Sequence, residues 1–329
     1  MRPGSGRGAI SPARETIDGS SSDAQTTDCS RQKSLALVSR MGLADITVAV
    51  PTFRPMVAPS LVDNPGTSDR EFFRAPAPSA VSDVPQLQQS SLRNRLLQAL
   101  SPGDFALIEP DLEKVSLPRG TVLIEPNEFI EHVYFLEAGI GSVVATTSEN
   151  RKVEVGIAGW EGLIGPSVVL GVSHTPHQSF IQVEGFGYRL PSAQLSHAID
   201  RSRTLHGLLL RYVHVLSLQV AATAMSNGDS VIGERLARWL LMSHDRVDDD
   251  EVPLTHEFLS IMLAVRRAGV TDALHVLEGA QIIQSRRGRI TILDRERLAE
   301  TAGETYGVPE AEYDKLIPDR GTSGLRKRG

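Results

Sequence analysis

The spacing of apolar residues along this 329-residue chain first predicts a domain of short strands. Leucines recur at helical spacing from Leu92 to Leu100, and β-rich runs then alternate with turn residues at intervals of about 8 to 12 residues. Such intervals are typical of an antiparallel sandwich or barrel, so we predict a jelly-roll-like β-roll domain over 91–190. The predicted strands are 115–117, 121–124, 132–136, 140–146, 152–157, 178–183 and 187–190, with Ala138-Gly139 as one of the turns.

After the last of these strands the apolar period becomes that of a helix. Apolar positions repeat by four and three residues over about three heptads, which predicts one long helix over 191–227. The seam consists of Leu205, Leu209, Tyr212, Leu216, Gln219 and Thr223. A long seam between two domains favours self-association through these residues. The alternative is a helix packed only inside its own chain, and Leu208 and Val215 widen the apolar face enough for one helix to do both.

Three shorter helical segments follow, at 234–243, 254–263 and 267–277, and then a short hairpin made of 282–283, 286–289 and 290–293. This order predicts a winged helix-turn-helix domain over 228–300, with Arg287-Gly288 as the turn of the wing. Thr255 is the expected N-cap of the first helix of the pair, and Ala264 lies in the tight turn between the two helices. The candidate DNA-binding residues are Thr255, Arg266, Arg267, Val270, Thr271, Arg286, Arg287 and Arg289.

Charge supports this assignment locally but not over the whole chain. The chain has 34 Lys and Arg against 40 Asp and Glu, so its net charge of −6 gives no general attraction to nucleic acid. Between Arg266 and Arg289, however, five arginines stand against only Asp272 and Glu278. Val270, with Ala273, Leu274 and Leu277, is expected on the core side of its helix. Asp272 faces outward, where it would repel phosphate or accept a hydrogen bond from a cytosine amino group.

Composition also gives predictions for the two ends of the chain, for its cellular location and for the cofactors it can bind. Residues 1–90 contain nine of the 19 prolines and no sustained period, so we predict a disordered extension, or alternatively an interaction segment; 301–329 is predicted to be a helix and tail. No export signal or uninterrupted apolar span is found, which predicts a cytoplasmic protein without a membrane segment. Cys29 is the only cysteine, which excludes a four-cysteine cluster, and His174 and His177 lack the further ligands of a metal site.

The order of β-roll, long helix and winged helix-turn-helix resembles the Crp/Fnr superfamily of bacterial transcription regulators, over about 92–316. Motifs that resemble a branch common in rhizobia are EHVYF at 131–135, VEVG at 153–156, ERLARWLL at 234–241, VRRAGVT at 265–271 and RRGRIT at 286–291. The resemblance implies an α+β fold with a cyclic-nucleotide-binding-like sensor domain and a dimerisation helix. It also implies a homodimer that binds double-stranded DNA at palindromic promoter sites and contacts RNA polymerase.

The effector region departs from the cyclic-nucleotide-binding members of this superfamily. Those members hold the phosphate by a Gly-Glu turn and an arginine about ten residues later, a charge-assisted contact. The comparable region here reads WEGLIG at 160–165, and no arginine lies between Arg151 and Arg189. The candidate effector-pocket residues are Glu161, Gly162, His177 and Gln178. We therefore expect absent or weak cyclic nucleotide binding, and the single thiol excludes an iron–sulfur cluster.

Two functions remain open at this point. The first is a sequence-specific DNA-binding regulator that works as a homodimer with a degenerate sensor domain. The alternative is a ligand-sensing protein whose helix-turn-helix makes protein contacts, because Asp272, Ala264 and Gly279–Gln281 depart from the pattern of relatives. An enzyme has no support, since the sequence contains no GxSxG, P-loop or HExxH motif.

Overall fold

The computed structural model describes residues 87–147, 149 and 151–318, all within one compact unit, Pro78–Gly329. The prediction of a disordered extension over 1–90 therefore lies almost wholly outside the described residues. The same holds for the end of the predicted tail, 319–329.

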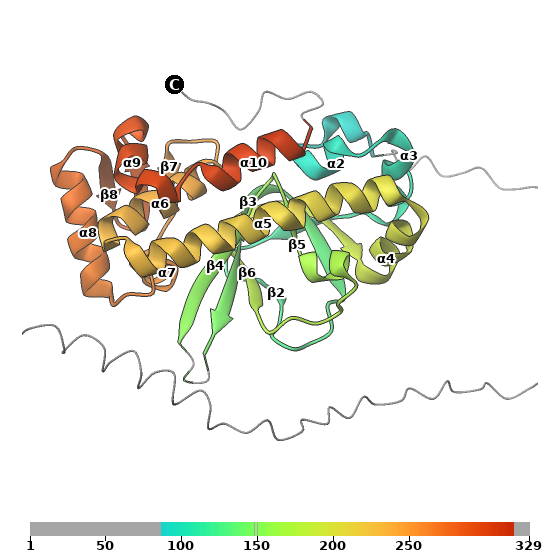
Figure 1. Cartoon of the computed structure of the whole chain (residues 1–329), viewed down its shortest axis with the longest axis horizontal. Coiled ribbons are helices and arrows are strands. Elements are labelled where there is room, and N and C mark those ends of the chain that lie inside the picture. Colours follow the sequence, from blue (N-terminus) through green and yellow to red (C-terminus); the bar gives the residue numbers. More distant parts are fainter. Residues whose placement is uncertain (1–86, 148, 150, 319–329) are drawn as a thin grey trace, which may run out of the picture. The chain divides into compact units, whose positions relative to one another are not determined.

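An antiparallel sheet forms the N-terminal part of the described chain (Figure 1). Its strands are β1 (Glu113–Leu117), β2 (Val122–Ile124), β3 (His132–Thr146), β4 (Lys152–Ala158), β5 (Leu163–Ile164) and β6 (Gln178–Pro191). The main order is β1-β6-β3-β4, with β2 paired to β6 and β5 paired to β3. Two short helices precede it, α2 (Arg95–Ala99) and α3 (Pro102–Phe105), and a 3-10 turn, η3 (Pro166–Leu170), follows β5. The expected α+β fold with an antiparallel β-roll is confirmed.

The turn predicted at Ala138-Gly139 is wrong, because β3 continues through it as one 15-residue strand. The register against β6 shifts on both sides of Ala138, so the glycine forms a bulge and not a turn. Gly139 has φ +89, and a Cβ added there would lie 2.6 Å from the carbonyl oxygen of Val183. Glycine therefore allows the strand to bend without ending. The predicted pair of strands 178–183 and 187–190 is likewise the single strand β6.

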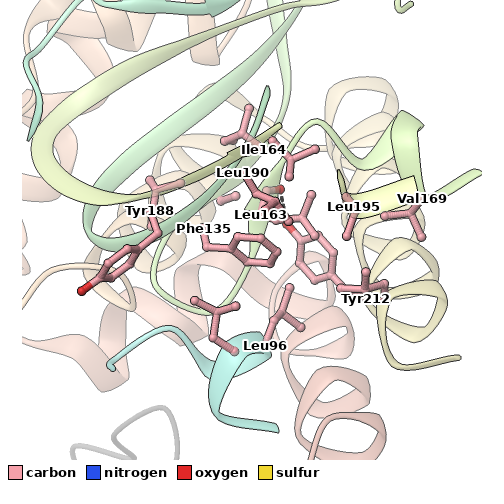
Figure 2. Packing of buried hydrophobic residues seen from close by; sticks show 14 of the residues in the cluster. Leu96, Phe135, Leu163, Ile164, Val169, Tyr188, Leu190, Leu195 and Tyr212 are labelled. Carbon is pink, nitrogen blue, oxygen red and sulfur yellow. Dashed lines mark hydrogen bonds between the residues drawn. The ribbon is translucent and has the colours of Figure 1, made fainter. Parts of the chain in front are cut away.

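The core of the β-roll lies between the sheet and the helices that cover it. Figure 2 shows Leu96 of α2, Phe135 of β3 and Leu163 of β5 together with Tyr212, and all four are at most 3% exposed. The Tyr212 hydroxyl donates to the Leu163 carbonyl oxygen at 3.1 Å, so this buried phenol has a partner. Aliphatic side chains fill most of the remaining core, as expected for a chain with 5% aromatic residues.

The single helix predicted over 191–227 is divided into α4 (Ser192–Arg201) and α5 (Arg203–Asp229). Ser202 lies between them in an extended conformation, with φ −135 and ψ 111. Its hydroxyl accepts from the Leu205 amide at 3.1 Å and donates to Asp104 Oδ1 at 2.5 Å. The N-cap and the buried contact to α3 together explain the break, which helical periodicity alone did not predict.

By length and composition α5 is long and apolar enough to cross a membrane. One such helix is weak support for a membrane span, because the core helix of a soluble protein passes the same test. Here α5 contacts β4, η3 and a C-terminal helix, α10 (Val308–Leu316), which runs alongside it (Figure 1).

A winged helix-turn-helix follows α5. Its elements are α6 (Ile232–His244), β7 (Glu251–Val252), α7 (His256–Met262), α8 (Arg267–Gly279), β8 (Ile283–Arg286), β9 (Arg289–Ile292) and α9 (Arg295–Ala302). β7, β9 and β8 form a small antiparallel sheet, and β8 and β9 turn at Arg287-Gly288. These helices and the hairpin are confirmed as predicted, with ends that differ by at most two residues.

Candidate functional site

The two helices of the helix-turn-helix begin and turn at the predicted residues. Thr255 is the N-cap of α7, and its hydroxyl accepts from the Phe258 amide at 3.3 Å. Ala264 has φ +51, a left-handed conformation that an L residue rarely adopts, and it reverses the chain between α7 and α8. Arg266 is the N-cap of α8 and Arg267 is its first residue, so both arginines stand at the end expected to meet DNA.

One face of α8 holds the helix in the domain and the other is exposed. Val270, Leu274 and Leu277 are at most 2% exposed and belong to the core of the C-terminal domain. The inclusion of Val270 among the DNA-binding residues is therefore wrong; its side chain packs against the protein, as its helical spacing indicated. The exposed residues of α8 within its first three turns are Arg267, Ala268, Asp272, His275 and Val276. Of these, sequence reasoning did not select Ala268 and His275, although the same spacing would have found them.

The arginine side chains of the site are mostly exposed to solvent. Arg267 lies 3.4 Å from Glu257, with both side chains about 70% exposed, a contact worth little in water. The Thr271 hydroxyl donates to the Arg267 carbonyl at 3.1 Å. Arg289 pairs with Glu251 at 2.5 Å. Arg286 and Arg287 are exposed beside Gly288, whose φ of +75 makes the tip of the wing.

The other helix of the pair, α7, is docked on the β-roll. The ring of Phe258 stacks on Phe180 of β6 with centroids 5.9 Å apart, and the Arg119 guanidinium lies 5.1 Å from the same ring. Arg119 also donates to the Pro253 carbonyl at 2.8 Å. Beneath them, Gln182 of β6 contacts the sulfur of Met262 at 3.2 Å. α7 thus joins the two domains, while α8 keeps its outer face free.

A buried ion pair forms a second junction between the β-roll and the C-terminal domain. Glu161 follows β4, Arg246 follows α6, and the two side chains are 6% and 7% exposed. Glu161 Oε1 accepts from Arg246 Nε at 2.8 Å and from Nη2 at 2.7 Å. Burial lowers the pKa of Arg246, but the charges of Glu161, Asp245 and Glu310 raise it by more, so the guanidinium stays charged.

This arrangement corrects the prediction for the effector pocket. Glu161 is paired with Arg246 and lines only a small cavity of about 30 Å³, and a Cβ added at Gly162 would lie 2.3 Å from the Tyr212 hydroxyl. Gln178 instead contacts Glu125 at 3.0 Å and Lys152 at 3.2 Å near the surface. Of the four predicted residues, His177 lines a larger cavity.

That cavity has a volume of about 200 Å³ and lies between η3, the sheet and α5. Its turn is Gly165-Pro166-Ser167, a few residues after the turn chosen from the sequence. The residues that line it are Ile124, Val143, Val155, Gly156, Gly165, Pro166, Ser167, Thr175, His177, Ser179, Leu216 and Val220. They include no arginine or lysine, so among the described residues nothing at this wall offers a fixed positive charge to a phosphate.

The predicted dimer seam faces inward. Leu205, Leu209, Tyr212, Gln219 and Thr223 are at most 5% exposed within the single chain, and Leu216 is half-buried. The prediction that these residues contact a second copy is therefore wrong for this face, because they pack against their own β-roll. The opposite face of α5 exposes a second apolar set at helical spacing, made of Leu210, Val220, Ala221, Ala224 and Met225. Periodicity found the helix and chose the wrong face.

The C-terminal domain and the fold are similar to known proteins. Residues 234–301 match the family model of the Crp-like helix-turn-helix domain. The structure is similar to FixK2 from Bradyrhizobium japonicum, with 17% identity, 57% of this chain and 95% of that chain covered, and a TM-score of 0.50. A Crp/Fnr-family regulator from Eubacterium rectale also matches, with 18% identity, 63% and 97% coverage and a TM-score of 0.49. Comparison with curated proteins gives no match.

Proposed function

We propose that this chain, which carries a Crp-like helix-turn-helix domain in a fold similar to that of Crp/Fnr regulators, is a DNA-binding transcription regulator that binds palindromic promoter sites as a homodimer. Regulators of this family are not enzymes. The observation that carries the proposal is the position of Arg266 and Arg267 at the exposed N-terminus of α8. In helix-turn-helix proteins this end of the second helix meets base edges in the major groove.

The outward face of α5 supports the homodimer. Leu210 and Val220 are each 39% exposed and Met225 is 66% exposed, on a helix whose other face is already packed. Two such helices placed side by side would remove these side chains from water. The dimer would present two α8 helices, which is the arrangement that reads two half-sites about one helical turn apart.

The cavity beside His177 supports a sensor domain that has lost cyclic nucleotide recognition. A cyclic phosphate buried there would lose its water without gaining a charge-assisted partner, which is costly. We propose that any effector is small and largely apolar, and that no iron–sulfur cluster serves this chain. We further propose a cytoplasmic location, no membrane association and contact with RNA polymerase at promoters, in keeping with the superfamily.

The decisive experiment is genome-wide DNA occupancy by immunoprecipitation and sequencing. The wild type is compared with an Arg266→Ala, Arg267→Ala double variant and with an Arg201→Ala, Arg203→Ala control, which removes two exposed arginines beside Ser202. Palindromic peaks that the control keeps and the first variant loses would support the proposal. Peaks unchanged in both variants would contradict the role of α8.

The alternative function, a helix-turn-helix used for protein contacts, makes a different prediction. For a DNA-binding protein, the logarithm of the binding constant falls linearly with the logarithm of the salt concentration, because phosphate contacts release counterions. Absence of both genomic peaks and salt-dependent binding, in a folded protein, would favour the alternative.

A further inference from the structure

The exposed face of α8 carries a carboxylate that the DNA-binding role has not explained. We propose that Asp272 reads cytosine, accepting a hydrogen bond from the N4 amino group of one C·G pair in each half-site. The inference rests on the proposed function, since it names the base that this same helix selects. It makes Asp272 a specificity-determining residue and not a source of affinity.

The position of Asp272 on the helix is the first argument. Ala268, Asp272 and His275 are spaced by four and three residues, so they form one stripe. All three are exposed, and they lie on the side of α8 opposite the buried residues Val270 and Leu277. Thr271 lies on one side of this stripe and the exposed Val276 on the other. If α8 enters a groove, Asp272 therefore lies at the centre of the face that meets the bases, not at its edge.

The small residues before Asp272 are the second argument. Ala268, one turn earlier on the same stripe, carries only a methyl group, and Gly269 beside it carries no side chain. No long side chain therefore holds this turn away from the groove floor. A close approach is what a short aspartate needs in order to reach a base edge, and the Ala268 methyl can then contact a thymine methyl.

The third argument is that the carboxylate is uncommitted within the protein. Among residues 87–318, as far as the structure describes them, the side chain of Asp272 has neither an ion pair nor a hydrogen bond. Arg267, the nearest arginine along the helix, instead contacts Glu257 at 3.4 Å. Asp272 is thus presented to a ligand with both oxygens available as acceptors.

The chemistry of the major groove then selects the base. Only cytosine N4 and adenine N6 offer donors there, while guanine and thymine present acceptors that repel a carboxylate. In adenine the donor lies beside the N7 acceptor, whereas the cytosine amino group is followed by an apolar C5–H edge. The cytosine amino group thus has an acceptor, O6 of the paired guanine, on one side only, whereas adenine N6 has acceptors on both sides, so cytosine repels Asp272 less. At any other base the negative charge remains unpaired near phosphates, which penalises incorrect sites.

The test uses the fact that asparagine, which has the same shape as aspartate, prefers adenine to cytosine. Asn bonds adenine through N6 and N7, so Asp272→Asn, which keeps the side-chain shape, should change one position of each half-site from cytosine to adenine. The full-length wild type and this variant are each used to select binding sites from a random duplex DNA library. Glu300→Gln, an exposed position on α9, serves as the control that removes one negative charge from the same domain.

The expected result is a wild-type site with one invariant cytosine per half-site, retained by Glu300→Gln and replaced by adenine in Asp272→Asn. Measured on single-base variants of the selected site, the preference for cytosine should fall at least about fivefold in Asp272→Asn, since a good base contact is worth about that factor or more. Circular dichroism melting of each protein shows that it is folded.

Three other outcomes overturn the inference and are distinct from one another. If the wild type selects a palindromic site and Asp272→Asn selects the same site with the same preferences, Asp272 does not read a base, and the proposed function stands. If no protein selects any sequence while all are folded, the proposed function fails and the inference fails with it. A change shared equally by Glu300→Gln would show a general effect of charge and would also overturn it.

Discussion

Replacing Arg246 by methionine tests whether the buried ion pair to Glu161 holds the two domains together. Methionine keeps much of the length of the side chain but removes the charge and the donors. Glu161, which is 6% exposed in the structure, would then keep the Gly159 amide, 3.1 to 3.2 Å away, as the hydrogen-bond donor to its carboxylate. The Met242 carbonyl oxygen would also lose the hydrogen bond that Arg246 donates to it at 2.6 Å.

The expected cost follows from the burial of both partners. Breaking a buried pair by removing one member leaves an uncompensated charge and costs about 3 to 5 kcal/mol. In a protein of this size 1 kcal/mol shifts the melting temperature by about 2 to 4 °C, so Arg246→Met should melt roughly 6 to 20 °C below the wild type. Differential scanning calorimetry of the full chain measures this shift.

Two further variants separate the pair from other effects. Glu161→Gln combined with Arg246→Met removes both charges and should recover a large part of the lost stability, because no lone buried charge remains. Arg151→Met disrupts the contact to Glu149, in which both side chains are over 70% exposed, and should cost less than about 0.5 kcal/mol. A melting temperature of Arg246→Met within about 2 °C of the wild type would refute the reasoning.

The remaining predictions concern the turn, the sheet and the outer face of α5. Ala264→Gly should raise the free energy of unfolding by about 1 kcal/mol, because glycine adopts the left-handed conformation at φ +51 without strain. Ala268→Gly, inside helix α8, should instead lower it by about 0.5 to 1 kcal/mol, and thermal melting of both variants measures the two opposite changes. Burial raises the pKa of Glu154 to about 8, so the native state keeps a proton that the unfolded chain releases near 4.5, and stability should fall as pH rises between these values. Glu154→Gln should flatten this dependence in melting curves from pH 5 to 8, and parallel wild-type and variant curves would contradict it. Leu210→Glu with Val220→Glu should give a monomer by sedimentation velocity if the outer face of α5 joins two copies, and an unchanged dimer would place the contact elsewhere.

The sequence predicted features that depend on local spacing and turn chemistry. The wing turn at Arg287-Gly288, the N-cap at Thr255 and the start of α8 are each defined by a few neighbouring residues, and the structure has them at the predicted positions. The strand bend at Gly139 was predicted as a turn, because a glycine between β-rich runs has the same local pattern whether the chain reverses or bulges.

Features that depend on residues far apart in the chain could not be predicted from local sequence patterns. Glu161 and Arg246 are 85 residues apart, and no local pattern indicates that they meet. Helical period located α5 but could not decide which of its two apolar faces its own β-roll would cover. The break at Ser202 depends on Asp104, from a different helix, which supplies the buried acceptor. Each of these outcomes was decided by tertiary packing.

The C-terminal helix α10 has a mechanical consequence for any motion of the DNA-binding domain. The chain leaves α5 at Ser230 to form that domain, and after α9 it returns to lie along α5 once more. There α10 is fastened by the Tyr313 hydroxyl, which donates to the Glu161 carbonyl at 2.5 Å, and by Asp314, which pairs with Arg95 at 2.9 Å. A body attached at one point swings freely, but a body attached at two points turns only about the line that joins them. Any reorientation of α8 about that line also has to break the contacts of α7 with β6 and the Glu161–Arg246 pair, so α10 adds a further constraint to a domain that is already docked.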